Sequence, residues 1–347
     1  MILVDPKTKT IIKSKFHKVF RNKDYEVFFN QETGLEVLRG IADKEDPFYT
    51  ELPLLLDIGI MGHCKNRCTF CYQGDQQEPN MPLSYFKLII DQTKHHVNQV
   101  ALGGRGDPNK HESFKEIVKY ARENGVVPNY TTSGIDLTDE EIEISKMCGA
   151  VAVSDYGNDF TYSAIQRFID AGIKTNIHLI FTRISYDKCL KILYGSNPWV
   201  RNQKAGELFD FDKLNAVIFL LFKPQGRGVN CQGLIPVSYQ IEAIANLILN
   251  PKAKVGVGID SCLANHIFKH GGLNKQQKMV LDSCEGSRQS AYISPAMKMM
   301  PCSYAEPFMG VQITQEQDIN YIWNRSNVFK QFRSQLKKRP YNCPAGF

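Results

Sequence analysis

The chain alternates short apolar runs with helical patterns from Leu54 onward, and this alternation limits the folds open to it more than any other feature. Strands are predicted at residues 54–61, 99–102, 126–132, 150–154, 174–181 and 216–222. Between them, apolar residues recur every three or four positions, which is typical of amphipathic helices. Strands joined by crossover helices form a parallel sheet, which right-handed connections wind into a barrel or a doubly wound sheet. We therefore predict an α/β fold.

A run of closely spaced cysteines follows the first of these strands. Cys64, Cys68 and Cys71 stand in the sequence Cys-Lys-Asn-Arg-Cys-Thr-Phe-Cys. Three loop thiolates can bind three irons of a four-iron cubane, which leaves the fourth iron open to a substrate. The spacing reverses that of compact ferredoxins, and no further cysteine lies nearby. Unrelated buried thiols or a zinc site are the alternatives. We discount zinc completed by His63, because adjacent His63 and Cys64 would rarely point at one metal.

This run resembles the signature of radical S-adenosylmethionine (radical SAM) enzymes, C-x3-C-x-aromatic-C at the end of the first barrel strand. Phe70 occupies the aromatic position and Tyr72 follows the last cysteine. The resemblance implies a partial (β/α)6 barrel, similar to a TIM barrel, with its chemistry at the carboxyl ends of the strands. It also implies that S-adenosylmethionine binds the open iron of a [4Fe-4S] cluster. An electron from the cluster then yields a 5′-deoxyadenosyl radical, which abstracts hydrogen from a substrate.

The resemblance continues at the second predicted strand, which runs into Gly103-Gly104-Arg105-Gly106-Asp107. Radical SAM enzymes carry a Gly-Gly-Glu loop at this place, whose backbone and carboxylate bind the methionyl amino group. Gly103 and Gly104 match this loop, whereas Arg105 replaces the glutamate. Asp107 is our candidate for the missing carboxylate, and a backbone carbonyl is the other option. An ordinary tight turn before a helix is the alternative interpretation.

Polar residues at the ends of other strands are further candidates for contacts with S-adenosylmethionine. Ribose hydroxyls and a carboxylate need donors and acceptors, and an arginine suits a carboxylate well. In the family, the end of the fourth strand often contacts the ribose. The candidates are Ser133, Ser154, Asp155, His178 and Arg183. His178 lies within an apolar strand, so a core histidine with satisfied hydrogen bonds is an equal alternative.

Four more cysteines form a second set in the last third of the chain: Cys262, Cys284, Cys302 and Cys343. The stretch from Cys284 to Cys302 predicts two strands about a proline turn, with a thiol at each end. It resembles the hairpin of SPASM and Twitch domains, which implies that Cys262 and Cys343 complete an auxiliary [4Fe-4S] cluster. No cysteine lies between Cys302 and Cys343, so the one-cluster Twitch version is the better match. Zinc held by four thiolates is the alternative.

These features divide the chain into three predicted parts. Residues 1–50 form a lead-in with a β-hairpin at 25–29 and 35–39, residues 51–235 the radical SAM core, and residues 236–347 the auxiliary-cluster domain. A stretch rich in glycine and proline at 223–230 reads as a linker before the last part. Cys231, which follows this linker, is a candidate hydrogen donor to a substrate radical.

The composition favours a cytoplasmic protein with reduced thiols. The ten cysteines occur in a chain without a signal peptide or a long apolar run. The formal net charge of +6 is mild and spread out, and no RNA-binding motif is present. We therefore expect neither a membrane nor a nucleic acid as a partner.

Together the motifs predict a radical SAM enzyme that modifies a peptide, by cross-linking, epimerisation or a related step in the maturation of ribosomally made peptides (RiPPs). The resemblance implies a flavodoxin- or ferredoxin-type electron donor. The first 50 residues are too short for a winged-helix leader-peptide module, so a peptide enzyme would need a separate recognition protein. The alternatives are oxidation or rearrangement of a small molecule in cofactor or antibiotic synthesis, and a non-enzymatic binding protein stabilised by zinc.

Overall fold

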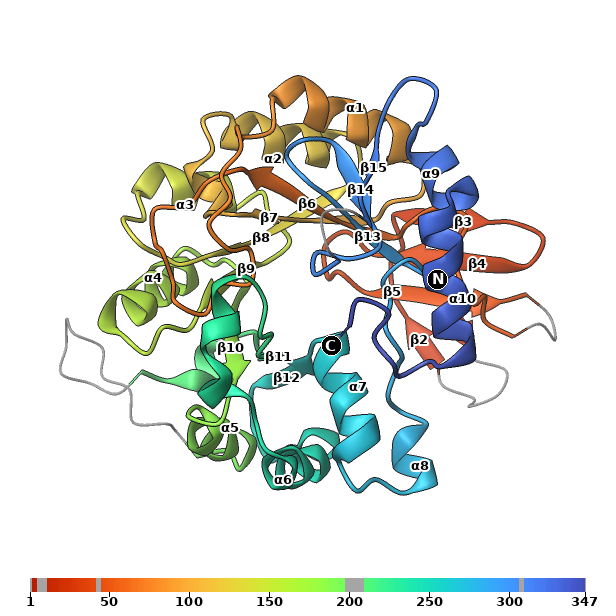
Figure 1. The fold of residues 1–347 in the computed structure, drawn as a ribbon. Helices are drawn as coiled ribbons and strands as arrows, with labels where there is room; N and C mark the ends of the chain where they lie inside the picture. The colour runs from red at the N-terminus through yellow and green to blue at the C-terminus, as the bar shows by residue number, and fades with distance from the viewer. Residues whose placement is uncertain (1, 5–10, 42–44, 197–208, 306–308, 347) are drawn as a thin grey trace.

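The centre of the molecule is one curved, mostly parallel sheet. The computed structural model describes residues 2–4, 11–41, 45–196, 209–305 and 309–346. Its ten-stranded sheet has the order β12-β11-β10-β9-β8-β7-β6-β13-β14-β15. Figure 1 shows the strands curving round a central space, with helices on the outside. The predicted α/β fold with a partial barrel is therefore confirmed.

Parallel strands follow one another along the sheet in chain order, as repeated β-α units require. They are β6 (Leu55–Met61), β7 (Gln99–Gly104), β8 (Val127–Thr132), β9 (Val151–Ser154), β10 (Thr175–Phe181), β11 (Ala216–Leu221) and β12 (Gly256–Ile259). The six strands predicted from the alternating pattern are all present. β12 pairs in parallel with β11 and so belongs to the same sheet, although it lies beyond residue 235.

The helices between these strands cover the outer face of the sheet. They are α1 (Leu83–Thr93), α2 (Phe114–Glu123), α3 (Asp139–Ser145), α4 (Asp159–Asp170), α5 (Tyr186–Leu193), α6 (Ser238–Leu249) and α7 (Ser261–His270). In α2, the apolar residues Phe114, Ile117 and Val118 are buried against the sheet. Each such side chain contributes about 1.5–3 kcal/mol by leaving water.

The period of two along each strand decides which residues face the central space. In β6, Leu56 and Ile58 are fully buried in the core between sheet and helices. Asp57, between them, points to the other face, because successive side chains of a strand alternate. In β10, Ile177 and Leu179 are buried while His178 faces the central space. Polar residues at alternate positions thus line the interior of the barrel.

The predicted hairpin after Cys284 is present and extends the barrel sheet. β13 (Ser290–Ile293) pairs in parallel with β6, and β14 (Lys298–Met300) returns antiparallel to β13. β15 (Val311–Gln312) pairs with β14. The helices α8 (Lys275–Lys278), α9 (Ile319–Arg325) and α10 (Asn327–Lys338) surround this part of the chain. Trp323 of α9 donates a hydrogen bond of 2.9 Å to the carbonyl of Thr50, which ties α9 to the start of the barrel.

The N-terminal part contains more strands than the predicted hairpin. β4 (Tyr25–Phe29) and β5 (Glu36–Gly40) form that hairpin, and Gly34 in its turn has a φ of 78°, which favours glycine. A third strand, β3 (Lys18–Arg21), pairs with β4, and β1 (Ile2–Val4) pairs with β2 (Ile11–Lys13). Among the described residues, no helix combines the length and apolar character needed to cross a bilayer.

Candidate functional site

A cavity of about 410 Å³ lies inside the partial barrel, at the carboxyl ends of the parallel strands. Most of the residues predicted to bind a cluster or S-adenosylmethionine meet at its wall. They are Cys64, Phe70, Cys68, Cys71, Tyr72, Gly103, Gly104, Asp107, Ser154, Asp155 and His178. The structure therefore brings one loop and several strand ends to a single place, as parallel β-α units do.

The cysteine loop between β6 and α1 is held in a defined conformation. Cys64, Cys68 and Cys71 are each half-buried, and the amide of Cys71 donates to the carbonyl of Cys68 at 3.2 Å. Arg67 has a φ of 38°, which a residue with a side chain rarely adopts. Arg227 fastens the loop, because its Nε donates to the carbonyl of Cys68 at 2.7 Å and its amide to that of Cys71 at 2.9 Å.

The three thiols suit a cubane rather than a single ion. In the described part of the chain, no three His, Cys, Asp or Glu side chains converge on a point where one metal ion would fit. A cubane needs a wider arrangement, because each thiolate binds a different iron. All three donors are thiols on one loop, and the cavity beside them leaves room for a ligand of a fourth iron. The residues present therefore fit a [4Fe-4S] cluster with one open iron.

The glycine loop after β7 packs directly on the backbone of the cysteine loop. Gly104 has a φ of 111°, and a Cβ atom there would lie 2.4 Å from the carbonyl oxygen of Met61. A Cβ atom on Gly106 would lie 2.3 Å from the carbonyl oxygen of His63. Only glycine allows such an approach. The loop is thus built for close contact with the cysteine loop and is not an ordinary exposed turn.

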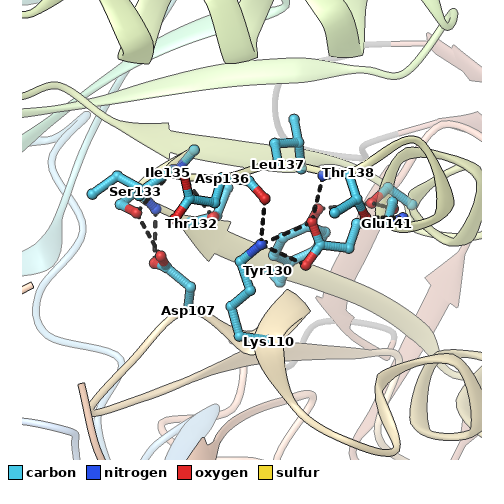
Figure 2. Close-up of polar contacts among 12 residues, drawn as sticks. Asp107, Lys110, Tyr130, Thr132, Ser133, Ile135, Asp136, Leu137, Thr138 and Glu141 are labelled. Carbon is cyan, nitrogen blue, oxygen red and sulfur yellow. Dashed lines mark hydrogen bonds and ion pairs between the residues drawn. The ribbon is translucent and has the colours of Figure 1, made fainter. Parts of the chain in front are cut away.

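Asp107 follows these glycines and is fixed by Ser133 at the end of β8. Its two carboxylate oxygens accept hydrogen bonds from the amide of Ser133 at 2.7 Å and from its hydroxyl at 2.5 Å (Figure 2). Burial raises the pKa of Asp107, and these hydrogen bonds act against that increase. Ser133 was predicted to contact the cofactor, but its side chain points at Asp107 and does not line the cavity. Ser133 thus orients the candidate carboxylate, and its own contact with the cofactor stays a prediction.

Arg105, which stands where the family has a glutamate, supports the chain that follows the cysteines. Its Nη1 donates to the carbonyl of Gln73 at 2.5 Å, and its Nη2 to the side-chain oxygen of Gln76 at 3.3 Å. Its Nε lies 3.8 Å from the carboxylate of Glu78. The guanidinium therefore holds residues 73–78 in place at the wall of the cavity.

The strand ends on the opposite wall carry polar side chains. These side chains differ in the number of hydrogen bonds and ion pairs that they already form within the protein. Asp155 accepts a hydrogen bond from Tyr162 at 3.1 Å and forms an ion pair with Lys188. His178 lies 3.4 Å from the hydroxyl of Thr131, and burial lowers its pKa to about 4, so it is neutral at pH 7. Ser154 borders the cavity without such an ion pair among the described contacts.

Two further predicted site residues, Arg183 and Cys231, are not among the described residues that line the cavity. Arg183 does not line the cavity, because the chain turns after β10 and its amide pairs with the carbonyl of Leu234. Cys231 lies beside the cysteine loop, with its sulfur 3.5 Å from the carbonyl of Thr69. It is not among the described residues that line the cavity. The role of Cys231 as a hydrogen donor stays a prediction.

Asp57 is a site residue that the sequence reading missed. Its carboxyl group lines the cavity from β6, and burial raises its pKa to about 7, although a hydrogen bond with Ser303 opposes this. A signal existed, since Asp57 is the one acid in the run Leu-Leu-Asp-Ile-Gly-Ile-Met. An acid at an alternate position of an apolar strand faces a polar interior or a ligand.

The comparisons with known proteins agree with this site. No protein-family model matches the chain. It is 22% identical over 305 residues to the mycofactocin maturase MftC of Mycolicibacterium smegmatis, covering 82% of this chain and 73% of that protein. It is 23% identical over 327 residues to the PqqA peptide cyclase of Methylocella silvestris, covering 84% and 81%. SuiB of Streptococcus suis, solved with S-adenosylmethionine, has the same fold, with a TM-score of 0.61 and 16% identity over 82% of this chain and 68% of SuiB.

The chain is similar to radical SAM enzymes in sequence and in fold. The likeness of sequence spans most of its length, and the cysteine run of the superfamily stands at the end of the first barrel strand. The glycine loop lies beside that run, as the resemblance implied. Two further regions of the structure bear on the site: a set of four thiols, and a second cavity that shares a wall with the first.

The four C-terminal thiols come together from separate segments. Cys262 lies in the first turn of α7, Cys284 and Cys302 flank the hairpin, and Cys343 follows α10. A Cβ atom on Gly286 would lie 3.3 Å from the sulfur of Cys284 and 3.4 Å from the Cβ of Cys302. Burial raises the pKa of Cys284 to about 11 and that of Cys302 to about 12, and the nearby thiol of Cys343 adds to both. No point among the described residues brings three such thiols close enough for one metal ion, so these four half-buried thiols suit a cluster, in which each thiolate binds a different iron.

A second cavity of about 610 Å³ adjoins the inner one. One wall is the chain after the cysteines, and the other is the face of the β13–β14 hairpin. The residues that border both cavities are Tyr72, Gln73, Arg105, Ser303 and Tyr304. The rings of Tyr72 and Tyr304 lie 4.5 Å apart, so this pair connects the cysteine loop to the segment after Cys302.

Proposed function

We propose that this protein is a radical SAM enzyme that modifies a peptide, as in the maturation of RiPPs. The observation that carries the proposal is the loop of Cys64, Cys68 and Cys71 facing a cavity inside the barrel, with the glycine loop beside it. When bound there, the cluster and S-adenosylmethionine supply a 5′-deoxyadenosyl radical that abstracts hydrogen from the substrate. Two relatives support the substrate class by name, as a maturase and a peptide cyclase. SuiB has been solved with its precursor peptide SuiA.

Different groups of side chains would bind the cluster, S-adenosylmethionine and the auxiliary cluster. Cys64, Cys68 and Cys71 would hold the cluster, and the glycine loop would receive the methionyl group. Asp107, already oriented by Ser133, would bind the methionyl amino group. Ser154 and the neutral His178 offer hydrogen-bonding groups on the opposite wall. Cys262, Cys284, Cys302 and Cys343 would hold an auxiliary [4Fe-4S] cluster, and a flavodoxin- or ferredoxin-type protein would supply electrons.

The lining of the second cavity, and its position next to the first, favour a peptide over a small molecule as substrate. Its wall after the cysteines carries the amide side chains of Gln73, Gln76 and Gln77, and Gln225 adds a fourth. Amide groups can donate to and accept from a peptide backbone at once. Two adjoining cavities also give an extended substrate room to reach the inner site from outside. A separate recognition protein for the leader of such a peptide remains part of the proposal.

The proposal is tested by the metal content and by the cleavage of S-adenosylmethionine. Protein purified without oxygen should contain about eight irons and as many sulfides per chain, enough for two cubanes. With dithionite, it should convert S-adenosylmethionine to 5′-deoxyadenosine. Zinc without sulfide, or intact S-adenosylmethionine in the presence of peptides encoded beside the gene, would refute the enzyme. A mass change in such a peptide would identify the substrate.

We expect Asp107→Asn to weaken the binding of S-adenosylmethionine about 10- to 100-fold. Asparagine can still accept from Ser133 but has no negative charge for an ammonium group, and a charged hydrogen bond contributes about 1.5–3 kcal/mol. Equilibrium dialysis of the anaerobic protein measures the affinity. Asp91→Asn, an exposed change on α1, is the matched control. If Asp107→Asn and the parent bound S-adenosylmethionine with equal affinity, Asp107 would not be a binding residue.

A further inference from the structure

Lys223 is a buried cation that lines the inner cavity and lies near Cys262 of the four C-terminal thiols. It stands just after β11, and its side chain is only 4% exposed. Its ammonium group forms an ion pair with Asp260 and lies 4.2 Å from the centre of the Tyr304 ring. A buried ammonium group without a partner would be costly, so these contacts explain how the charge is kept inside the protein.

The partners of Lys223 belong to the segments that carry the thiols. Asp260 is the N-cap of α7 and accepts from the amide of Leu263 at 2.8 Å, and Cys262 lies in the same helical turn. Tyr304 comes two residues after Cys302. On its other side, Lys223 lines the inner cavity. One lysine thus touches both the wall of the cavity and the surroundings of two thiols.

The charge of Lys223 persists in the folded protein. Burial alone would lower its pKa, but Tyr304 and Asp260 outweigh burial, and the pKa lies well above the usual value. At neutral pH the group is therefore a fixed positive charge. In surroundings that exclude water, such a charge acts more strongly on a neighbouring charge than it would in solution.

We propose that Lys223 sets the reduction potential of the auxiliary cluster held by the four thiols. This inference rests on the proposed auxiliary cluster. One-electron reduction adds a negative charge to an already anionic group, and a nearby fixed cation favours the reduced state. Net charge and hydrogen bonds are among the factors that set the potentials of iron-sulfur clusters. Lys223 is not a catalytic residue in this proposal, since it acts on the cluster and not on the substrate.

The test is a redox titration of the full chain in which Cys64, Cys68 and Cys71 are alanine, so that only the auxiliary cluster is observed. Dithionite supplies the electrons and electron paramagnetic resonance follows the reduced cluster. We expect Lys223→Met to lower the equilibrium constant for reduction about tenfold, which is about 59 mV for one electron. Lys223→Arg, which keeps the charge, should stay within threefold of the parent. Asp260→Asn should shift the potential in the opposite direction to Lys223→Met.

Iron analysis separates this inference from the proposed function. Each variant should hold about four irons, the content of one cubane. A Lys223→Met variant with full iron and a change below threefold, or with a change of the opposite sign, would overturn the role of Lys223. Loss of iron from Lys223→Met would also overturn it and assign the lysine a structural role. A parent chain that holds zinc or no iron would instead refute the auxiliary cluster itself.

Discussion

Replacing Cys64, Cys68 and Cys71 together with alanine should lower the iron content from about eight to about four per chain and reduce 5′-deoxyadenosine formation to the background level. The three thiols sit on one loop at the wall of the inner cavity, and alanine offers no ligand for iron. The four remaining thiols are gathered elsewhere and should keep their own cluster. Iron and sulfide analysis, with chromatographic detection of 5′-deoxyadenosine, measures both effects.

Cys231→Ala is the matched control for the iron content. Its thiol is also half-buried and lies close to the cysteine loop, yet it does not line the cavity. This variant should keep about eight irons. If the triple variant also kept all its iron, the cysteine loop would not be a cluster site. If it lost all its iron, the two thiol sets would not hold independent clusters.

Asp57→Asn should stabilise the protein at alkaline pH and leave its stability unchanged near pH 4. Burial raises the pKa of Asp57 to about 7, whereas an unfolded aspartate has a pKa of about 3.9. Folding therefore disfavours the ionised form, so Asp57 lowers the free energy of unfolding. This loss is absent below pH 4, grows up to pH 7 and is constant above it. The full cost is at most about 4 kcal/mol, and about 2 kcal/mol if water in the cavity reaches the carboxylate.

Denaturant unfolding of the anaerobic protein at several pH values measures this effect. The gain in the free energy of unfolding for Asp57→Asn over the parent should rise between pH 4 and pH 7. Asp91→Asn, exposed on α1 and paired with Lys94, is the control and should show no gain at pH 8. A gain that is the same at pH 4.5 and pH 8 would mean that Asp57 is not a neutral acid in the folded protein.

Elements with a local signal were predictable from the sequence. The cysteine run is contiguous, so its spacing alone predicted an iron-sulfur site. The strands β6 to β11 carry mostly apolar runs bounded by helical patterns, which is the local signal of parallel strands in β-α units. The short strand β3 was missed, because Lys-Val-Phe-Arg is too brief to show a period and forms only through pairing with β4.

Residues just after the strands were harder to place than the strands themselves. Ser133 and Arg183 were both expected in the site because each follows a strand. In the structure, Ser133 turns to Asp107, and the chain at Arg183 turns away to pair with Leu234. The direction of a side chain in a loop depends on hydrogen bonds to distant segments, which no local pattern contains. Asp57 was predictable in principle, because it lies inside a strand where alternation decides its direction.

The sequence by itself determined the order of strands and helices, the place of the first thiol set and the resemblance to radical SAM enzymes that this set carries. These are properties of contiguous residues, since periods of two and 3.6 and the spacing of ligands are local. Only the tertiary structure decided that Cys262, Cys284, Cys302 and Cys343 meet, and that Lys223 lies near Cys262. Their meeting depends on β13 pairing with β6, a contact between residues more than two hundred positions apart. Such pairing arises from the closure of the whole sheet.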